Sequence, residues 1–272
     1  PGVNRFLFSL SPSHPITVYV RLYDEYYPGA ISFLELRDPS IALPTDGDSI
    51  MLYSLTCIAA VFSILSFFFF FFVKERAYLF FGIYTFLLAS HYMMILHPDL
   101  PLIDAIFYEV PWIATPLFNF CVTLGFIFFF LFGKSFMNLA SLSRKTDKTL
   151  MIFVTVWASM LFVEFILNIT LHRFVLNPYM LYISIPLMLS FVVRFAFFKT
   201  ILSRFFVGGA LWLTFFTILG ILTNNGIIDP PVNPWPVAQC GELMIFAAGL
   251  AYKVRLNERA RAEADRIKEI DD

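Results

Sequence analysis

Long apolar segments separated by short polar stretches dominate the chain after residue 47. Each segment is about 20 residues long, which is enough for a helix to cross a hydrocarbon layer of ~30 Å. The seven segments are residues 50–73, 77–97, 111–133, 149–170, 178–200, 204–223 and 236–254. The pattern therefore predicts an all-α polytopic membrane protein, with a seven-helix transmembrane bundle over residues 48–254.

The first segment ends in an unusual run, SILSFFFFFFVKERAYLFFGIY at residues 63–84. Six consecutive phenylalanines, Phe67 to Phe72, leave such a helix no polar side, which suits lipid rather than water. The composition agrees, because 59% of the residues are hydrophobic and only 14% are charged, against about 25% charged in an ordinary globular domain. We expect these phenylalanines to face lipid or neighbouring helices, and Lys74 and Arg76 to end the span.

Residues 1–47 follow a different pattern. The string PITVYVRLYDEYY alternates apolar and polar positions, and AISFLELRDPS predicts a second short strand near Ile31–Leu36. Tyr27-Pro28-Gly29 lies between them and is typical of a turn. Because two strands alone are marginal in water, we interpret residues 1–47 as the C-terminal strands of a larger β-domain followed by a linker. The chain begins at Pro1 rather than Met, so we also expect it to be part of a longer protein.

The C-terminal string YKVRLNERARAEADRIKEIDD contains neither glycine nor proline, and the last glycine is Gly249. We expect the seventh span to continue without a break into a cytoplasmic helix over residues 255–272 that leads to a missing effector. An apolar stripe at heptad-like spacing predicts a parallel coiled coil and hence a homodimer. The stripe consists of Leu256, Ala260, Ile267 and Ile270, with Glu263 interrupting it. A solvated charged tail that merely ends the last span is the alternative.

The basic residues of the loops predict the orientation of the bundle. Ten Lys and Arg residues lie on one side and one lies on the other. The ten are Lys74, Arg76, Lys134, Arg144, Lys145, Lys148, Lys199, Arg204, Lys253 and Arg255, and the single residue is Arg173. Because positively charged loops stay in the cytoplasm, we expect a multi-pass protein of the inner membrane. Its N-terminal β-remnant would lie outside the cell and its C-terminus inside.

Ionisable side chains within membrane spans are costly and suggest a functional site. His91, Glu164 and Glu242 each lie about six residues from the predicted outer end of a span, or about 9 Å along a helix. Asn168 and Gln239 are polar companions of this candidate cluster. The five residues could line a pocket that opens outward, or they could form a buried hydrogen-bond network that fixes helix packing.

Other chemistry has little support in the sequence. No phosphate-binding loop, glycine-rich nucleotide loop or H-E-x-x-H motif is present, so we predict neither an enzyme nor a cofactor. The three cysteines, Cys57, Cys121 and Cys240, lie in apolar stretches and are interpreted as packing residues. One histidine and two carboxylates on separate spans are a weak signal for a metal, and we predict none. The net charge of −1 gives no reason to expect nucleic acid as a partner.

The last span, AQCGELMIFAAGLAYKVRLNERARAEAD, resembles the bacterial seven-transmembrane receptors with diverse intracellular signalling modules. The second-span string YLFFGIYTFLLASHYMMI is also similar to that family, and the resemblance covers about residues 50–260. Residues 14–40 look like the last strands of the family's extracellular β-domain. The resemblance implies an extracellular small-molecule or carbohydrate-like ligand. It also implies a histidine kinase or diguanylate cyclase type of effector beyond Asp272.

We therefore predict a receptor segment that relays an extracellular signal through the bundle to a cytoplasmic effector. The alternative is a membrane transporter or channel. A transporter or channel would require a polar path through the inner half of the bundle, and the spans carry no such chain of acidic residues there.

Overall fold

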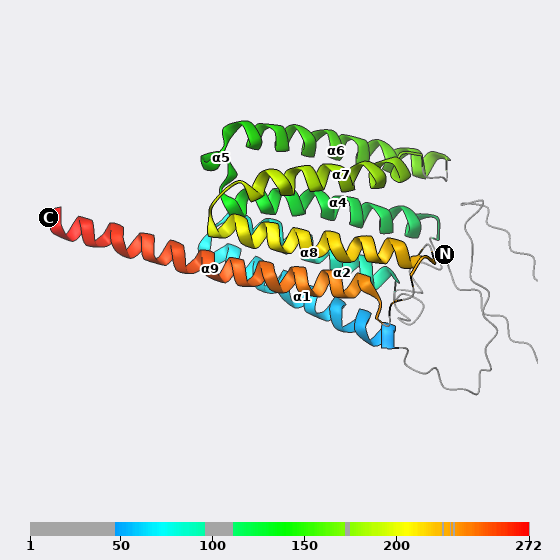
Figure 1. The fold of residues 1–272 in the computed structure, drawn as a ribbon, viewed down its shortest axis with the longest axis horizontal. Coiled ribbons are helices and arrows are strands. Elements are labelled where there is room, and N and C mark those ends of the chain that lie inside the picture. Colours follow the sequence, from blue (N-terminus) through cyan, green and yellow to red (C-terminus); the bar gives the residue numbers. More distant parts are fainter. Residues whose placement is uncertain are drawn as a thin grey trace, which may run out of the picture.

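The computed structural model describes residues 47–95, 111–171, 175–224, 226–228, 230 and 232–271. Within these ranges the chain forms seven long helices and one short one (Figure 1). They are α1 (Gly47–Val73), α2 (Arg76–Ile95), α4 (Pro111–Met137), α5 (Leu139–Leu142), α6 (Arg144–Leu171), α7 (Asn177–Ala196), α8 (Ile201–Asn224) and α9 (Pro234–Asp271). The strands predicted near the N-terminus lie outside the described residues.

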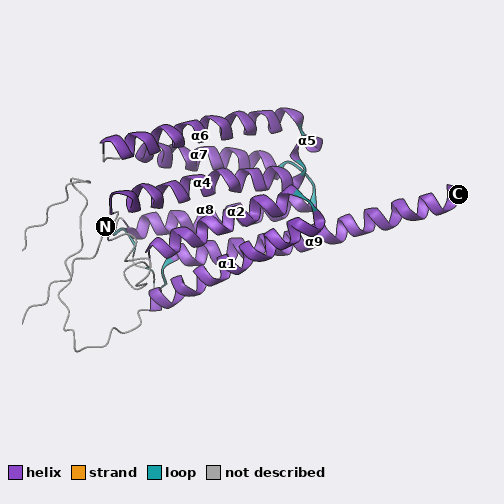
Figure 2. Cartoon of the chain, turned by 180° about the vertical axis from the view of Figure 1, so that it is seen from behind, coloured by secondary structure: helices purple, strands orange, loops and turns teal. Residues whose placement is uncertain are grey.

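The seven long helices run side by side as a bundle, as the views from opposite sides in Figures 1 and 2 show. Six of them are long and apolar enough to cross a membrane. The remaining helix, α7, has 20 residues and a shorter apolar stretch, Pro186–Ala196, and it packs against α8. The prediction of an all-α polytopic membrane protein with a seven-helix bundle is thus confirmed.

Some helix ends differ from the apolar segments for local reasons. Helix α6 begins at Arg144, before the apolar segment, and Asp147 in its first turn complements the positive end of the helix dipole. The fifth predicted segment extended to residue 200, whereas α7 ends at Ala196. Thr200 instead caps the start of α8, because its Oγ1 accepts a hydrogen bond of 3.1 Å from the Ser203 amide in the first turn of that helix.

Helix α4 lies in the middle of the bundle and contacts α2, α6 and α8, while α9 packs chiefly on α8 and also contacts α1. Helix α1 is at the edge. Within its phenylalanine run, the side chains of Phe68, Phe71 and Phe72 are 57%, 72% and 71% exposed. These rings therefore face outward, where a membrane would supply lipid, as the apolar run predicts.

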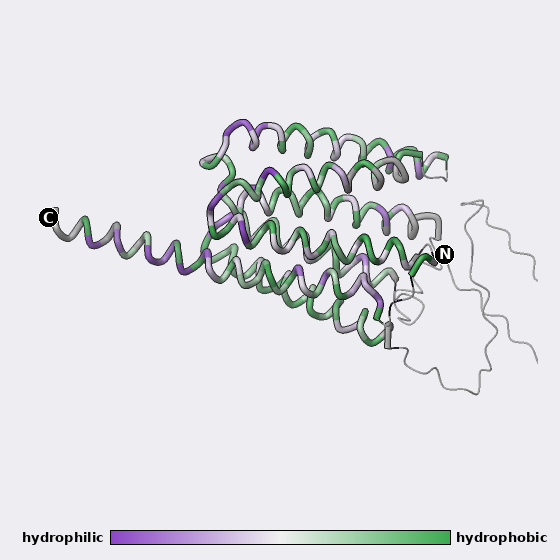
Figure 3. Tube along the Cα trace, viewed as in Figure 1, coloured by the Kyte–Doolittle hydropathy of each residue, from purple (hydrophilic) through white to green (hydrophobic). Residues whose placement is uncertain are grey.

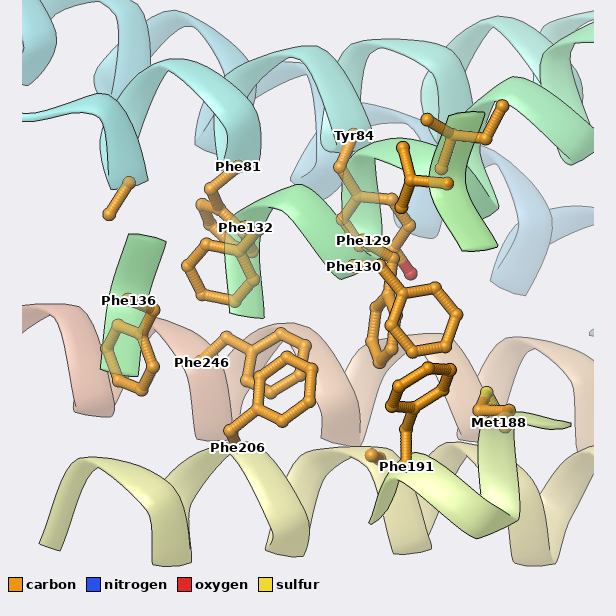
Figure 4. Packing of buried hydrophobic residues seen from close by; sticks show 14 of the residues in the cluster. Phe81, Tyr84, Phe129, Phe130, Phe132, Phe136, Met188, Phe191, Phe206 and Phe246 are labelled. Atoms are coloured by element: carbon orange, nitrogen blue, oxygen red, sulfur yellow. The ribbon is translucent and has the colours of Figure 1, made fainter. Parts of the chain in front are cut away.

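Aromatic rings fill the space between α2, α4, α8 and α9 (Figure 4). The centre of the Phe132 ring lies 5.0 Å from the ring centres of Phe81 and Phe246. Phe206 and Phe246 stack almost in parallel, 5.5 Å apart at an angle of 10°. All four rings are buried, so this aromatic core joins four helices that are distant in the sequence.

Glycines allow the helices to approach closely enough for these contacts. At Gly209 on α8, a Cβ atom would lie 2.4 Å from the ring of Phe246 on α9. At Gly133 on α4, a Cβ atom would lie 2.4 Å from the ring of Phe206 on α8. Small residues at helix interfaces are the usual way to achieve close packing in membranes, where apolar burial gives helices little reason to associate.

Helix α9 is unbroken over 38 residues, which confirms the predicted continuation of the seventh span. Its C-terminal part projects beyond the other helices (Figure 1). Hydrophilic and hydrophobic residues alternate along this projection, whereas most of the bundle is hydrophobic (Figure 3). One rigid element therefore connects the interior of the bundle to a region beyond it.

The close contact at Gly209 predicts a different response from its neighbour Gly208, where a Cβ atom would meet nothing within 4 Å. Replacing Gly209 by alanine should destabilise the detergent-solubilised protein by about 1–3 kcal/mol, because it overpacks the Phe246 ring. Gly208→Ala should be neutral or slightly stabilising, since alanine favours a helix over glycine by about 1 kcal/mol. Thermal unfolding midpoints compare the two. Phe246→Leu should partly rescue Gly209→Ala, and equal midpoints for both glycine variants would contradict the packing.

Candidate functional site

The five polar residues singled out in the sequence fall into two places in the structure. Gln239 and Glu242 on α9 face α2, whereas Glu164 and Asn168 lie on α6, on the other side of α4. His91 is on α2. Neither of the two cavities considered below is lined by residues of both groups. The structure therefore separates the two groups, because equal depth along a span says nothing about position around the bundle. That either group forms a binding site stays a prediction.

The first group is a buried hydrogen-bonded contact between α2 and α9, which we call the Tyr84 contact. The Tyr84 hydroxyl donates to Oε2 of Glu242 at 2.8 Å and lies 3.3 Å from Oε1 of Gln239. The Glu242 side chain is 0% exposed and that of Tyr84 is 6% exposed. A polar group at such a site is costly without a partner, so the contact selects the position in which these two helices meet.

His91 lies two turns beyond Tyr84 on α2 and is half-buried. Its ring packs edge-on against the ring of Tyr92, with centres 5.3 Å apart. Two turns correspond to about 10 Å along the helix. The histidine thus shares a helix with the Tyr84 contact but lies at a different level.

Glu164 links α6 to the start of α7. Its two carboxylate oxygens accept hydrogen bonds from the backbone amides of Val175 at 3.1 Å and Leu176 at 2.7 Å. Leu176 immediately precedes α7, and a carboxylate suits the positive end of a helix. Glu164 therefore fixes the connection between these helices.

Asn168, one turn after Glu164, is 2% exposed. Both residues line a small cavity of about 10 Å³ between α4, α6 and α7, which also includes Pro116, Asn119 and Met180. A cavity of that size holds at most about one water molecule. It is too small for an organic ligand, so this second group has the geometry of a packing network.

A further polar cluster lies where α9 leaves the bundle, and we call it the exit junction. Lys253 on α9 forms an ion pair with Oε1 of Glu75, which lies in the turn between α1 and α2. The same ammonium group donates to the backbone oxygen of Ser135 on α4 at 2.9 Å. Asn257, one turn later on α9, donates to the other oxygen of Glu75 at 2.9 Å.

The exit junction is compact because Lys253 is only 6% exposed. Its ammonium group also lies 5.8 Å from the centre of the Phe136 ring, a distance suited to a cation–π contact. Three separate elements, the α1–α2 turn, α4 and α9, therefore meet at a single cation. The sequence analysis used Lys253 as one of the ten basic residues that predict the orientation of the bundle.

The two contacts lie on one face of α9. Lys253 follows Glu242 by about three turns, since 3.6 residues make a turn of the helix, so the two side chains project in nearly the same direction. Tyr84 and Glu75, their partners, come from α2 and from the turn that precedes it. The α1–α2 unit thus holds α9 at two levels about 16 Å apart along the helix.

Neither contact could be recognised from residue types alone. Tyr84 and Glu242 are 158 positions apart in the sequence, and Glu75 and Asn257 are 182 apart. The available signal was a tyrosine in an apolar span, whose hydroxyl usually finds a hydrogen-bond partner when it is buried, but the sequence does not say which partner. The pairing requires knowledge of which helices are neighbours.

Comparison with known proteins assigns the bundle to a family. A family model described as "7TM diverse intracellular signalling" matches residues 49–253, which is most of the chain and every spanning helix. No curated protein and no solved structure gives a significant match.

The Tyr84 contact predicts an energetic coupling between α2 and α9. In a double-mutant cycle, Tyr84→Phe and Glu242→Leu should be non-additive by about 1 kcal/mol, within the range of hydrogen bonds between membrane helices. Unfolding free energies in detergent micelles provide the measurement. Tyr78 is the matched control, because it is also buried on α2 and its hydroxyl donates to the Leu250 backbone oxygen rather than to Glu242. Tyr78→Phe and Glu242→Leu should be additive, and coupling of equal size in both cycles would argue against the contact.

Proposed function

The chain belongs to the family of seven-transmembrane domains for diverse intracellular signalling. On that premise, we propose that helix α9 is the element through which this receptor domain transmits its signal. The family consists of sensory receptor domains rather than catalytic ones. The chain is accordingly a multi-pass membrane signalling domain, and the proposal concerns how it works.

The observation that carries the proposal is the continuity of α9 from Pro234 to Asp271. Because the helix has no break, a shift or rotation inside the bundle reaches the projecting end without loss. Besides its packing on α8, the helix is held on a second face by two polar contacts, the Tyr84 contact and the exit junction. Signalling transitions often consist of small helix movements between two packed arrangements.

We propose that the two contacts define one resting arrangement of α9 against α2. A ligand that favours another arrangement would shift the population by its difference in affinity for the two. Hydrogen bonds and ion pairs are suited to such a role, because they are made or broken over small displacements. The aromatic core between the two levels would keep the helices packed during the change.

The proposal also includes the direction of signalling, the ligand outside the cell and the effector inside it. The ten-to-one distribution of basic residues supports an inner-membrane protein with the N-terminus outside and the C-terminus inside. The ligand would be an extracellular small molecule or carbohydrate-like compound that binds the N-terminal region. The effector would be of the histidine kinase or diguanylate cyclase type, attached after Asp272.

A transporter or channel is the second candidate, and the packing gives it less support. Phenylalanine rings occupy the middle of the bundle between α2, α4, α8 and α9 (Figure 4). A solute path would require polar side chains or open space at this level. Neither of the cavities described in this part of the chain crosses it.

Output from a fused effector tests the proposal. With a histidine kinase output domain joined after Asp272, Tyr84→Phe and Lys253→Gln should change basal output in the same direction, because both loosen the same arrangement of α9. A loss of about 1 kcal/mol corresponds to a change of about fivefold. Met244→Leu is the control, since Met244 is on α9 but 69% exposed. Unchanged output from both variants at normal membrane levels would contradict the proposal.

Reporter fusions test the orientation. A reporter that is active only outside the cytoplasm should be active after Asp46 and inactive after Asp272, and a cytoplasmic reporter should show the reverse. Activity of one reporter at both positions would mean that an even number of spans separates them.

Cross-linking tests the proposed homodimer. Leu256 and Ile267 of the apolar stripe are 36% and 56% exposed, so they are available to a second chain. In a background with the three native cysteines replaced by alanine, Ala260→Cys and Ile267→Cys should form disulfides between chains in membranes. Ala262→Cys, an exposed position on another face of α9, should do so much less. Uniform cross-linking, or none, would argue against a parallel coiled coil.

A further inference from the structure

An open recess of about 670 Å³ lies beside the exit junction. Its walls come from the α1–α2 turn, the start of α2, the end of α4, helix α5, and parts of α6, α8 and α9. The volume falls in the range of small-molecule sites, roughly 300–1,000 Å³. The recess is therefore large enough for a molecule far bigger than water, unlike the cavity beside Glu164.

Basic side chains dominate the charged lining of the recess. The cations are Lys74, Arg76, Lys134 and Lys253, and the only acidic residue among the lining residues is Glu75. Lys134 pairs with Asp147 of α6 at 3.1 Å, and Lys253 pairs with Glu75.

Lys74 and Arg76 have no ion-pair partner within the described part of the chain, and both are exposed. Even with both acidic partners counted, the recess retains an excess of two positive charges. Helix α2 begins at Arg76, so the positive end of its dipole adds to this field.

Two helix ends shape the backbone of the recess. Among the described residues, Lys74 and Asn138 are the two non-glycine residues with left-handed backbone conformations, with φ of 54° and 53°. Both line the recess. They directly follow α1 and α4, where a left-handed residue commonly ends a helix.

Most of the remaining lining is apolar and includes Phe80, Leu131, Met151, Leu202 and Leu256, while Ser135, Asn138 and Asn257 add neutral polar groups. A site with an apolar wall and an unbalanced cationic rim suits an anion that carries a nonpolar portion. Lysine provides a point charge and arginine a planar fork for phosphate oxygens. We propose that this recess binds a phosphate-bearing anion, either the headgroup of a phospholipid or a soluble phosphoryl compound.

Binding would act directly on the exit junction. A phosphate group in the recess competes with Glu75 for the Lys253 ammonium group, because both anions seek the same cation. Occupancy would thus loosen one of the two contacts that hold α9. This regulatory consequence rests on the proposed signalling function, whereas binding itself does not.

Binding is tested on the whole chain in lipid nanodiscs. The first arm compares phosphatidylcholine discs with discs that contain 30% phosphatidylglycerol, and the second adds inorganic pyrophosphate to phosphatidylcholine discs. Thermal unfolding midpoints and native mass spectrometry of retained lipid report binding. We expect a higher midpoint in at least one arm, and the arm identifies the source of the phosphate.

Two double variants separate a site from general surface charge. Lys74→Gln with Arg76→Gln removes two charges from the recess, whereas Arg144→Gln with Lys145→Gln removes two from exposed positions at the start of α6 that do not line it. The first pair should weaken binding at least fivefold and the second less than twofold. Equal losses in both pairs, or no midpoint shift in either arm, would overturn the proposal. If binding holds but the fused effector does not respond to it, the regulatory consequence fails and the site remains, while the Tyr84→Phe and Lys253→Gln variants test the proposed function separately.

Discussion

The constraint on which this structure depends is that polar side chains buried among apolar helices must find their partners inside the protein. Glu242 is fully buried on α9, and the Tyr84 hydroxyl on α2 satisfies one of its carboxyl oxygens. Lys253 on the same face of α9 is nearly as buried and is satisfied by Glu75 and by the Ser135 carbonyl. These requirements place α9 against α2 more narrowly than apolar packing could, because lipid competes for apolar contacts but not for hydrogen bonds.

Between the two polar levels, the packing is aromatic and close. Phe246 lies against Phe206 and over Gly209, so α8 and α9 approach closely along a rigid surface. Such an interior resists continuous deformation and favours a small number of discrete arrangements. The combination of a stiff aromatic core with polar contacts at its ends suits a helix that changes position as a unit. The continuous α9 makes the same change available beyond the bundle.

The sequence predicts the helices well and their partners poorly, for physical reasons. Hydropathy and the absence of helix breakers are local properties, so the seven spans and the unbroken α9 follow from them directly. Depth in the membrane is also nearly local, which is why Glu164 and Glu242 were expected at one level. Their position around the bundle depends on helix order, and α4 separates α6 from α9. In the structure, Glu164 accepts hydrogen bonds from the two backbone amides that precede α7. The sequence does not predict this role, because it does not give the conformation of the loop before α7.

The most direct test of the central claim, that two polar contacts on one face hold α9 in place, is a distance measurement. Spin labels at Lys148 on α6 and Ala262 on α9, both exposed, can be introduced after replacement of the three native cysteines. Pulsed electron paramagnetic resonance in nanodiscs then gives the distribution of distances between the labels. We predict a single narrow distribution for the parent protein, and a shifted or second population when Tyr84→Phe and Lys253→Gln are combined. An unchanged narrow distribution in that double variant would contradict the account, because the remaining contacts of α9 would then be enough to hold it in place.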